Sequence, residues 1–420
     1  MAGQVVGIQP NVLRWARTRA GYSVEDIANK LKRDPAEVKA WEAGEAAPTY
    51  AQLEKLAYDL YKRPLALFFL PEPPQEADVK QEFRTLPNSE LDQLLPNTRY
   101  LLRLGQAFQL SLKELTEGIN PFDHKIFKEI KLTDAAQISS VAQRVREYLA
   151  IDIETQVAWG SNDEALKVWR NAVESAGVFV FKQSFKQKSI SGFCLMDAEF
   201  PIIFINNGTS KTRQIFTLFH ELAHFFVGIN SISKLDDSYI DDLPSKEKKI
   251  EQICNALAAE ILVPLKDFQK QIEKYQILDG DSIQSLANRY RVSREVILRL
   301  SLDSRHINQT EYSMKLKSEM LSADKIKDFC QKWRITEFSL FGSVLREDFR
   351  PDSDLDVLVT FAPHVPWTIL DLVTMETELA ELVGRDVDLV EKRVIERSKN
   401  FIRQAEILNS AQVFYAQGDV

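Results

Sequence analysis

The stretch TLFHELAHFF, residues 217–226, places two of the chain's five histidines four residues apart, with a glutamate after the first. Residues i and i+4 lie on one face of an α-helix, so His220 and His224 can bind one metal ion, while Glu221 lies a third of a turn away. Most neighbouring positions are apolar, which predicts a buried helix. Burying three polar side chains without partners costs on the order of several kcal/mol.

A metal ion would remove that cost. Two neutral imidazoles and one further protein ligand form a zinc site of the zincin type, with a fourth position left for water that a nearby glutamate deprotonates. The alternative is a pair of hydrogen-bonded histidines in a hydrophobic core. The presence of Glu221 and the scarcity of histidine elsewhere favour the metal site.

A second predicted helix follows at residues 246–264, with the sequence KEKKIEQICNALAAEILVP. Glu251 and Asn255 flank its apolar stripe on one side, whereas Glu260 lies about half a turn around the helix. The two glutamates therefore cannot both face one ion. Periodicity alone leaves open which of them is the third ligand.

These two helices resemble the ImmA/IrrE family of metallopeptidases, in which the histidine motif precedes the pattern E-x-x-x-N-x-x-A-x-x-x-L-x-P. The residues that match this pattern are Glu251, Asn255, Ala258, Leu262 and Pro264. The resemblance implies a zincin-like α/β metallopeptidase with a small sheet over residues 100–310. It implies that His220, His224 and Glu251 bind Zn²⁺, that Glu221 is the general base, and that the substrate is a specific protein such as a repressor.

Short runs rich in β-forming residues precede the histidine helix. The run VFVFKQ begins at Val178, and SGFCLMD (191–197) and PIIFINN (201–207) bracket a turn, which predicts a hairpin. We expect a strand of this hairpin to bind a substrate segment by edge pairing.

A second group of candidate catalytic residues lies in SLFGSVLREDFRPDSDLDVLVTF, residues 339–361. The run SDLDVLV is typical of a strand, and alternation puts Asp354 and Asp356 on the same face. Two adjacent carboxylates repel each other unless a cation binds between them, so Mg²⁺ is the expected ion. Gly342 and Ser343 end the preceding strand in a tight turn whose backbone N–H groups can bind phosphates. An exposed acidic edge strand is the alternative.

This stretch resembles the minimal nucleotidyltransferases of the polymerase-β-like superfamily, whose pattern is G-S, then D-x-D, then a later strand with one essential aspartate. The resemblance implies an α/β domain with a mixed sheet over residues 320–420. It implies that Gly342, Ser343 and Arg346 bind the nucleotide, which is ATP or another nucleoside triphosphate. It also implies that Asp354, Asp356 and Asp388 are catalytic and bind Mg²⁺ or Mn²⁺. Small members of this group resemble antitoxins that attach AMP to a partner toxin.

The first 72 residues predict a set of short helices that resembles an Xre-type helix-turn-helix; an ordinary four-helix bundle is the alternative. Ser23 is a predicted N-cap, with Asp26 three residues on. The expected recognition segment carries Asp34, Glu37 and Glu42 against only Lys39, which disfavours an approach to phosphates and favours a protein-docking role.

Five of the chain's 16 prolines fall between residues 71 and 96, which predicts a connector over residues 73–99.

The composition of the chain limits its expected partners and cellular compartment. With 61 acidic and 53 basic residues the net charge is -8, so any DNA contact requires a local basic patch. Three separated cysteines indicate a reducing compartment, and the apolar runs are too short to cross a bilayer. We expect a cytoplasmic α+β multidomain protein with no membrane contact, which can form a homo-oligomer.

The predicted function is regulation in a toxin–antitoxin or phage-defence setting. In that role the protein would cleave a partner protein or transfer a nucleotide to it, the partner being a repressor or a cognate toxin. Operator DNA is a further candidate partner. The alternative is a DNA-binding transcriptional regulator, or an antitoxin, in which the peptidase fold senses or binds rather than cleaves.

Overall fold

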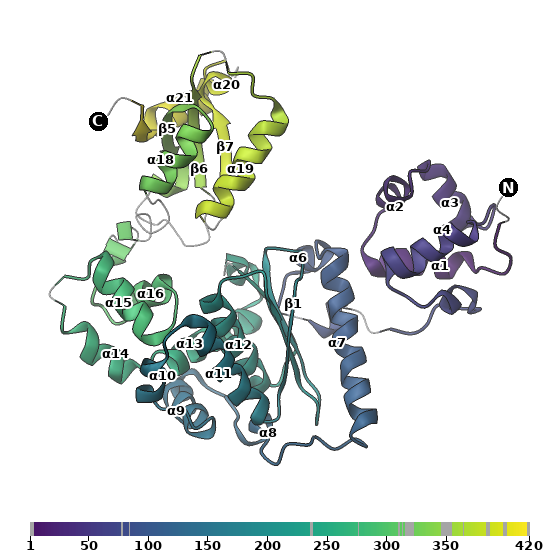
Figure 1. Cartoon of the computed structure of the whole chain (residues 1–420), viewed down its shortest axis with the longest axis horizontal. Helices are drawn as coiled ribbons and strands as arrows, with labels where there is room; N and C mark the ends of the chain where they lie inside the picture. The colour runs from purple at the N-terminus through teal and green to yellow at the C-terminus, as the bar shows by residue number, and fades with distance from the viewer. Residues whose placement is uncertain are drawn as a thin grey trace. The chain divides into compact units, whose positions relative to one another are not determined.

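The computed structural model describes residues 4–76, 79–83, 85–235, 238–275, 277–309, 311–312, 314–315, 323–345, 355–363, 365–383, 387–397 and 401–417. Within these ranges, no helix combines the length and the apolar character needed to span a membrane. The chain divides into two compact units (Figure 1). The first holds residues 1–235, 239–276 and 289–292, and the second holds 236–238, 277–288 and 293–420.

The N-terminal helices of the first unit pack around a hydrophobic core of their own, which includes Val12, Ile27 and Trp41. Ser23 caps the second helix as predicted: its hydroxyl accepts from the Asp26 N–H, and the Asp26 carboxylate accepts from the Ser23 N–H, both at 2.9 Å. The elements are α1 (Pro10–Ala20), α2 (Val24–Leu31), α3 (Pro35–Ala43), α4 (Tyr50–Glu54), the π-helix η1 (Lys55–Tyr61) and the 3₁₀ helix η2 (Leu65–Phe69).

The acidic residues of α3 do not all face solvent. Glu42 is buried, and its carboxylate pairs with Arg17 at 2.7 Å. Asp34 caps α3 by accepting from the Ala36 N–H at 2.8 Å. Asp34, Glu37 and Lys39 are exposed, so the burial of Glu42 alone makes this segment's surface less acidic than the sequence indicated.

Part of the predicted connector packs into the hydrophobic core instead of bridging solvent. Its apolar side chains are buried there against the central sheet of this unit and the long helix α7 (Pro96–Leu115). These side chains are Phe83, Leu86, Leu91 and Leu94. Proline marks turns in this segment, but the apolar side chains between the prolines determine where it packs. The helices here are α5 (Val79–Glu82), α6 (Asn88–Asp92) and α7 (Pro96–Leu115).

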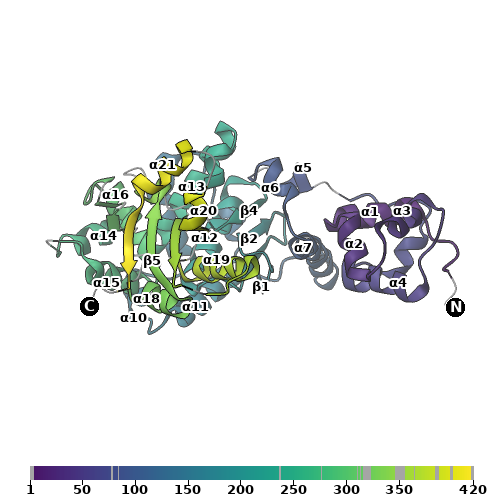
Figure 2. The same ribbon diagram turned by 90° about the horizontal axis from the view of Figure 1, so that it is seen from above.

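The centre of the first unit is a mixed four-stranded sheet in the order β1-β3-β2-β4. Helix α7 covers one face, where its Leu101 and Leu102 share a core with Phe193 and Phe204. Helices α11 (Asn162–Ser175) and α12 (Lys211–Val227) cover the opposite face, and α13 (Ser245–Leu262) packs against α12 (Figures 1 and 2). The strands are β1 (Phe179–Gln183), β2 (Ile190–Leu195), β3 (Ile202–Asn206) and β4 (Ser231–Lys234).

Further helices complete this region and continue into the second unit. They are α8 (Ile126–Glu129), η3 (Ala135–Gln137), α9 (Ile138–Tyr148), α10 (Ile153–Ala158), α11 (Asn162–Ser175), α12 (Lys211–Val227), η4 (Ser238–Asp242), α13 (Ser245–Leu262), α14 (Leu265–Ile272), α15 (Gly280–Tyr290) and α16 (Arg294–Asp303).

The predicted hairpin is confirmed, but its expected role as a binding edge is wrong. Strands β2 and β3 pair antiparallel, with Phe193 opposite Phe204. Strand β2 also pairs with β4, and β3 pairs with β1, so neither hairpin strand lies at an edge of the sheet. The edge beside α12 is β4, and there the Thr85 hydroxyl accepts a hydrogen bond from the Ile232 N–H at 3.2 Å.

Gly192 on β2 allows α12 to approach the sheet closely. A Cβ atom at this position would lie 2.6 Å from the Thr217 Cγ2 atom on α12 and 2.7 Å from the Phe204 carbonyl oxygen. We expect Gly192→Ala to lower the free energy of unfolding by about 1–3 kcal/mol, because the backbone must move to admit the methyl group. Urea unfolding measures this change.

Gly160 offers a matched control, since a Cβ atom there would meet only the Glu164 Oε2 atom at 3.5 Å, an ordinary contact. Gly160→Ala should change the free energy of unfolding by less than about 0.5 kcal/mol. Equal destabilisation by the two substitutions would contradict the close packing of α12 on β2.

The second unit contains a mixed four-stranded sheet in the order β7-β6-β5-β8, in which only β6 and β7 run parallel. Helices α20 and α21 pack on one face around Phe341, Leu358 and Ile395, and α18 and α19 lie on the other (Figures 1 and 2). The elements are α18 (Ala323–Lys332), β5 (Ile335–Phe341), η5 (Gly342–Leu345), β6 (Leu355–Phe361), α19 (Ile369–Val383), β7 (Val387–Glu391), α20 (Lys392–Glu396), α21 (Phe401–Ser410) and β8 (Gln412–Ala416).

Candidate active sites

The structure brings His220 and His224 of α12 together with Glu251 of α13. The two Nε2 atoms lie 3.0 Å apart. Glu251 places Oε2 at 3.3 Å from His220 Nε2 and Oε1 at 3.4 Å from His224 Nε2. All three side chains are buried, and one ligand atom from each lies within 4.8 Å of the others. Three such donors around one point form a candidate metal site.

Glu260, the alternative that periodicity left open, lies away from the histidines. Its Oε1 atom accepts hydrogen bonds from the Ser139 hydroxyl and the Leu265 N–H, each at 3.3 Å. The structure therefore selects Glu251 as the carboxylate that faces the imidazoles.

Two residues of α13 contact the outer nitrogens of the imidazoles. The Asn255 Oδ1 atom lies 2.7 Å from His220 Nδ1, and the Cys254 Sγ atom lies 3.6 Å from His224 Nδ1. An amide oxygen only accepts hydrogen bonds, so His220 carries a proton on Nδ1, which leaves Nε2 as the nitrogen that can bind a metal ion when the ring is neutral. Contacts of this kind fix the tautomer and orientation of metal-binding histidines.

A cation fits the space between these three side chains. The Glu251 Oε1 atom is buried and has no hydrogen-bond donor among the described residues. Burial lowers the pKa of His224 to about 3, so its imidazole is neutral and does not supply the missing positive charge. A buried carboxylate oxygen without a positive partner is costly. The donor set of two nitrogens and one oxygen is one that Zn²⁺ accepts.

Glu221 points to the edge strand and is fully buried. The Ser233 hydroxyl donates to its Oε1 atom at 2.6 Å, and the Ser231 hydroxyl donates to its Oε2 atom. Burial raises the pKa of Glu221, while the nearby His220 and the two serine hydroxyls act in the opposite direction. Sequence reasoning missed both serines, although their i, i+2 spacing in SISK indicates side chains on one face of a strand.

The second candidate site lies on the sheet of the second unit. Asp356 on β6 and Asp388 on β7 are direct neighbours in the parallel register, so their side chains project from the same face. Gly342 follows β5 with φ +72°, and a Cβ atom there would lie 2.1 Å from the Asp356 Oδ2 atom. The glycine turn thus lies against the carboxylate, where only a residue without a side chain fits.

The remaining residues predicted for this site are only partly described. Asp354 and Arg346 lie outside the described residues, as does the side chain of Ser343. Asp388 is exposed and Asp356 is half-buried, so both are accessible to a ligand at this end of the sheet. The arrangement of two carboxylates beside a glycine turn suits a divalent cation with a phosphate.

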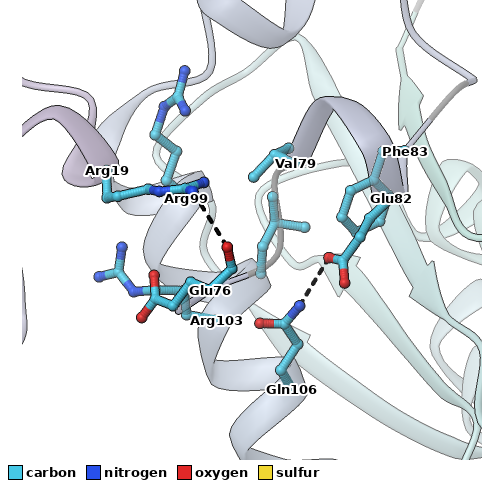
Figure 3. Close-up of a pocket in the computed structure, with 9 residues that line it drawn as sticks. Arg19, Glu76, Val79, Glu82, Phe83, Arg99, Arg103 and Gln106 are labelled. Carbon is cyan, nitrogen blue, oxygen red and sulfur yellow. Dashed lines mark hydrogen bonds between the residues drawn. The ribbon is translucent and has the colours of Figure 1, made fainter. Parts of the chain in front are cut away.

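A small cavity lies elsewhere in the first unit, beside α7. It has a volume of about 30 Å³ and is lined by charged residues that include Arg19, Glu82 and Arg103 (Figure 3). Glu82 accepts a hydrogen bond from Gln106 at 2.8 Å, and burial lowers the pKa of Arg103 to about 10. The volume suits a water molecule rather than a nucleotide or a peptide.

The chain thus has two clusters of residue types that bind metal ions, one on helices α12 and α13 and the other on strands β6 and β7. Residues 173–301 match the family model described as IrrE N-terminal-like domain, of peptidase M78, and residues 323–411 match the model described as nucleotidyltransferase domain. The chain belongs to the nucleotidyltransferase domain family through its C-terminal region, and its central region is similar to the IrrE-like peptidase M78 domain.

Individual relatives agree with this division. Protein adenylyltransferase MntA of Thermococcus cleftensis is 37% identical over 73 residues, which are 17% of this chain and 71% of that protein. A relative from Methanocaldococcus jannaschii is 34% identical over 65 residues, 16% of this chain and 64% of its own length. Radiation response metalloprotease IrrE of Deinococcus radiodurans is 34% identical over 99 residues, 23% of this chain and 29% of that protein. The chain thus spans less than a third of the length of IrrE.

Proposed function

We propose that the protein is a regulatory enzyme with two active sites that act on a specific partner protein. The C-terminal site transfers AMP from ATP to the partner, and the central site is a zinc-dependent endopeptidase. The observation that carries the first activity is the pairing of Asp356 with Asp388 beside the turn at Gly342. The endopeptidase activity is proposed from the cluster that His220 and His224 form with Glu251.

In the transfer reaction, a hydroxyl oxygen of the acceptor attacks the α-phosphorus of ATP. The bond from that phosphorus to the bridging oxygen breaks, pyrophosphate leaves with the bonding electrons, and the hydroxyl proton is released to solvent. Mg²⁺ or Mn²⁺ would be bound by Asp356 and Asp388 together with Asp354, and the ion would stabilise the charge on the phosphates. Gly342 lets the turn lie directly against the Asp356 carboxylate, so that its backbone N–H groups can bind a phosphate near the ion, and Ser343 and Arg346 would make the further nucleotide contacts.

In the cleavage reaction, His220, His224 and Glu251 would hold Zn²⁺, which lowers the pKa of a bound water. Glu221 lies next to His220 in the sequence and serves as the proton acceptor. Ser231 and Ser233 hold its carboxylate in one orientation. The surrounding apolar side chains of α12 and the sheet exclude bulk water and strengthen these polar contacts.

The setting we propose is toxin–antitoxin control or phage defence in the cytoplasm, with a cognate toxin or a repressor as partner. Protein adenylyltransferase is the name that the Thermococcus relative carries, and it supports a protein as acceptor here. A homo-oligomer is compatible with this role.

A DNA-binding regulator is the second candidate. The observation in its favour is that Arg17 neutralises Glu42 inside the N-terminal helices, which leaves the outer face of α3 less acidic. In that case residues 1–72 act as an Xre-type helix-turn-helix on operator DNA, and the peptidase fold senses or binds rather than cleaves.

Radiolabelled ATP tests the transfer activity. With Mg²⁺ and proteins encoded beside this gene, label on the α-phosphate should remain on one partner, whereas label on the γ-phosphate should leave with pyrophosphate. Retention of the γ-label would indicate a kinase, and retention of neither label on any partner would contradict the proposal.

A further inference from the structure

Tyr239 lies at the candidate zinc site although it belongs to neither motif helix. It comes from η4, between β4 and α13, and its side chain is 3% exposed. The ring packs in the hydrophobic core with Ile240 and Leu243. Its hydroxyl donates a hydrogen bond to the Glu251 Oε2 atom at 3.0 Å.

The two oxygens of Glu251 consequently have different surroundings. Oε2 accepts the hydrogen bond from Tyr239 and lies 3.3 Å from His220 Nε2. Oε1 faces His224 Nε2 at 3.4 Å and has no hydrogen-bond donor among the described residues. One oxygen is therefore already held, and the other is the buried atom that still requires a positive partner.

We propose that Tyr239 is a positioning residue that makes Glu251 a one-oxygen metal ligand. Its hydroxyl holds Oε2, so the carboxylate offers only Oε1 to the ion. This inference rests on the proposed zinc site. A carboxylate that bound through both oxygens would take the position that a hydrolytic site keeps for water.

The same hydrogen bond also limits how the carboxylate turns. Glu251 reaches the imidazoles from a neighbouring helix, and rotation about its terminal bond would exchange or misplace the two oxygens. The Tyr239 ring is fixed by the core around it, so its hydroxyl defines one orientation. Outer contacts of this kind commonly change metal affinity by ~10–100-fold.

Tyr290 provides a matched control within the same unit. Its hydroxyl also donates to a carboxylate, the Asp267 Oδ2 atom, at 2.6 Å, and its side chain is fully buried. Asp267 is not part of the histidine cluster. Tyr239→Phe and Tyr290→Phe therefore remove the same chemical group from similar surroundings, but only one of them lies at the proposed zinc site.

The test uses the full chain stripped of metal and loaded with Zn²⁺ or Co²⁺ alone. We expect Tyr239→Phe to weaken Zn²⁺ binding by ~10–100-fold in competition with a chelating dye. We also expect a weaker visible absorption from bound Co²⁺, since a second carboxylate oxygen raises the coordination number. Tyr290→Phe should leave both readouts at the wild-type level. The unfolding midpoint of each metal-free variant shows whether it is folded.

The outcomes separate this inference from the zinc site itself. A wild-type chain that binds no Zn²⁺ would overturn both. Zn²⁺ binding by the wild type, with the same affinity and the same Co²⁺ spectrum in Tyr239→Phe, would overturn the role of Tyr239 alone. Equal weakening in the two phenylalanine variants would also overturn it, because general loosening of the core would then be the cause.

Discussion

Replacing Asp356 with asparagine is expected to abolish AMP transfer to the partner protein. Asp356 lies beside Asp388 in the parallel register and against the turn at Gly342. Asparagine keeps the size of the side chain but removes the charge that holds a divalent cation next to phosphate. Metal stabilisation is worth several kcal/mol in such reactions, so the rate should fall by at least ~100-fold. Intact-mass spectrometry of the partner measures the loss.

Asp328→Asn is the matched control for this experiment. Asp328 is exposed on α18 in the same unit and undergoes the same chemical change. It should retain full transfer, and Asp388→Asn should behave like Asp356→Asn. A gain of one nucleotide monophosphate by the partner with Asp356→Asn, at the wild-type rate, would refute the assignment.

The second large effect is expected from Glu221→Gln, which should keep zinc but lose cleavage of the partner. Glutamine can still bond with Ser231 and Ser233, so the surroundings of α12 should persist. It cannot take a proton from water, and general-base catalysis contributes about 10²–10⁴-fold to the rate. Cleavage is measured by electrophoresis of the partner protein, and zinc by elemental analysis.

Glu260→Gln serves as its control, because Glu260 lies on α13 outside the histidine cluster. This variant should cleave normally. Undiminished cleavage by Glu221→Gln would rule out the proposed mechanism and would favour a peptidase fold that senses or binds.

Local spacing predicted much of the candidate zinc site. The i, i+4 spacing of His220 and His224 is a property of one helix, so the sequence alone predicted that they share a face. The choice between Glu251 and Glu260 depends on how α13 packs against α12. Periodicity describes the faces of a helix but not which face its neighbour covers. The family resemblance implied Glu251, and the packing of the two helices places Glu251 beside the imidazoles.

Contacts between separate elements account for what the sequence did not predict. The hydroxyls that hold Glu221 come from Ser231 and Ser233 on β4. The hydroxyl that holds Glu251 comes from Tyr239 on η4. No sequence motif links these residues to the two glutamates. The hairpin was predicted correctly from alternation, but its position in the sheet was not. Strand order depends on where β4, a four-residue strand after the histidine helix, pairs in the sheet, and alternation within a strand does not predict its neighbour.

At the C-terminal site, too, the sequence predicted local geometry but not the contacts between separate elements. Alternation predicted which residues of one strand share a face, but the distance between Asp356 and Asp388 depends on a strand pairing across more than thirty residues of chain. The parallel register places them opposite each other. The later strand of the expected pattern therefore lies beside the earlier one.

Elemental analysis of the purified chain tests most directly whether His220, His224 and Glu251 form a zinc site. The wild type and Glu260→Ala should each contain about one zinc ion per chain, because replacing Glu260 leaves all three donors in place. Glu251→Ala should contain almost none, since the two imidazoles alone leave the ion without its charged ligand. Full zinc occupancy in Glu251→Ala, or a wild type that binds no zinc when it is supplied, would contradict the account.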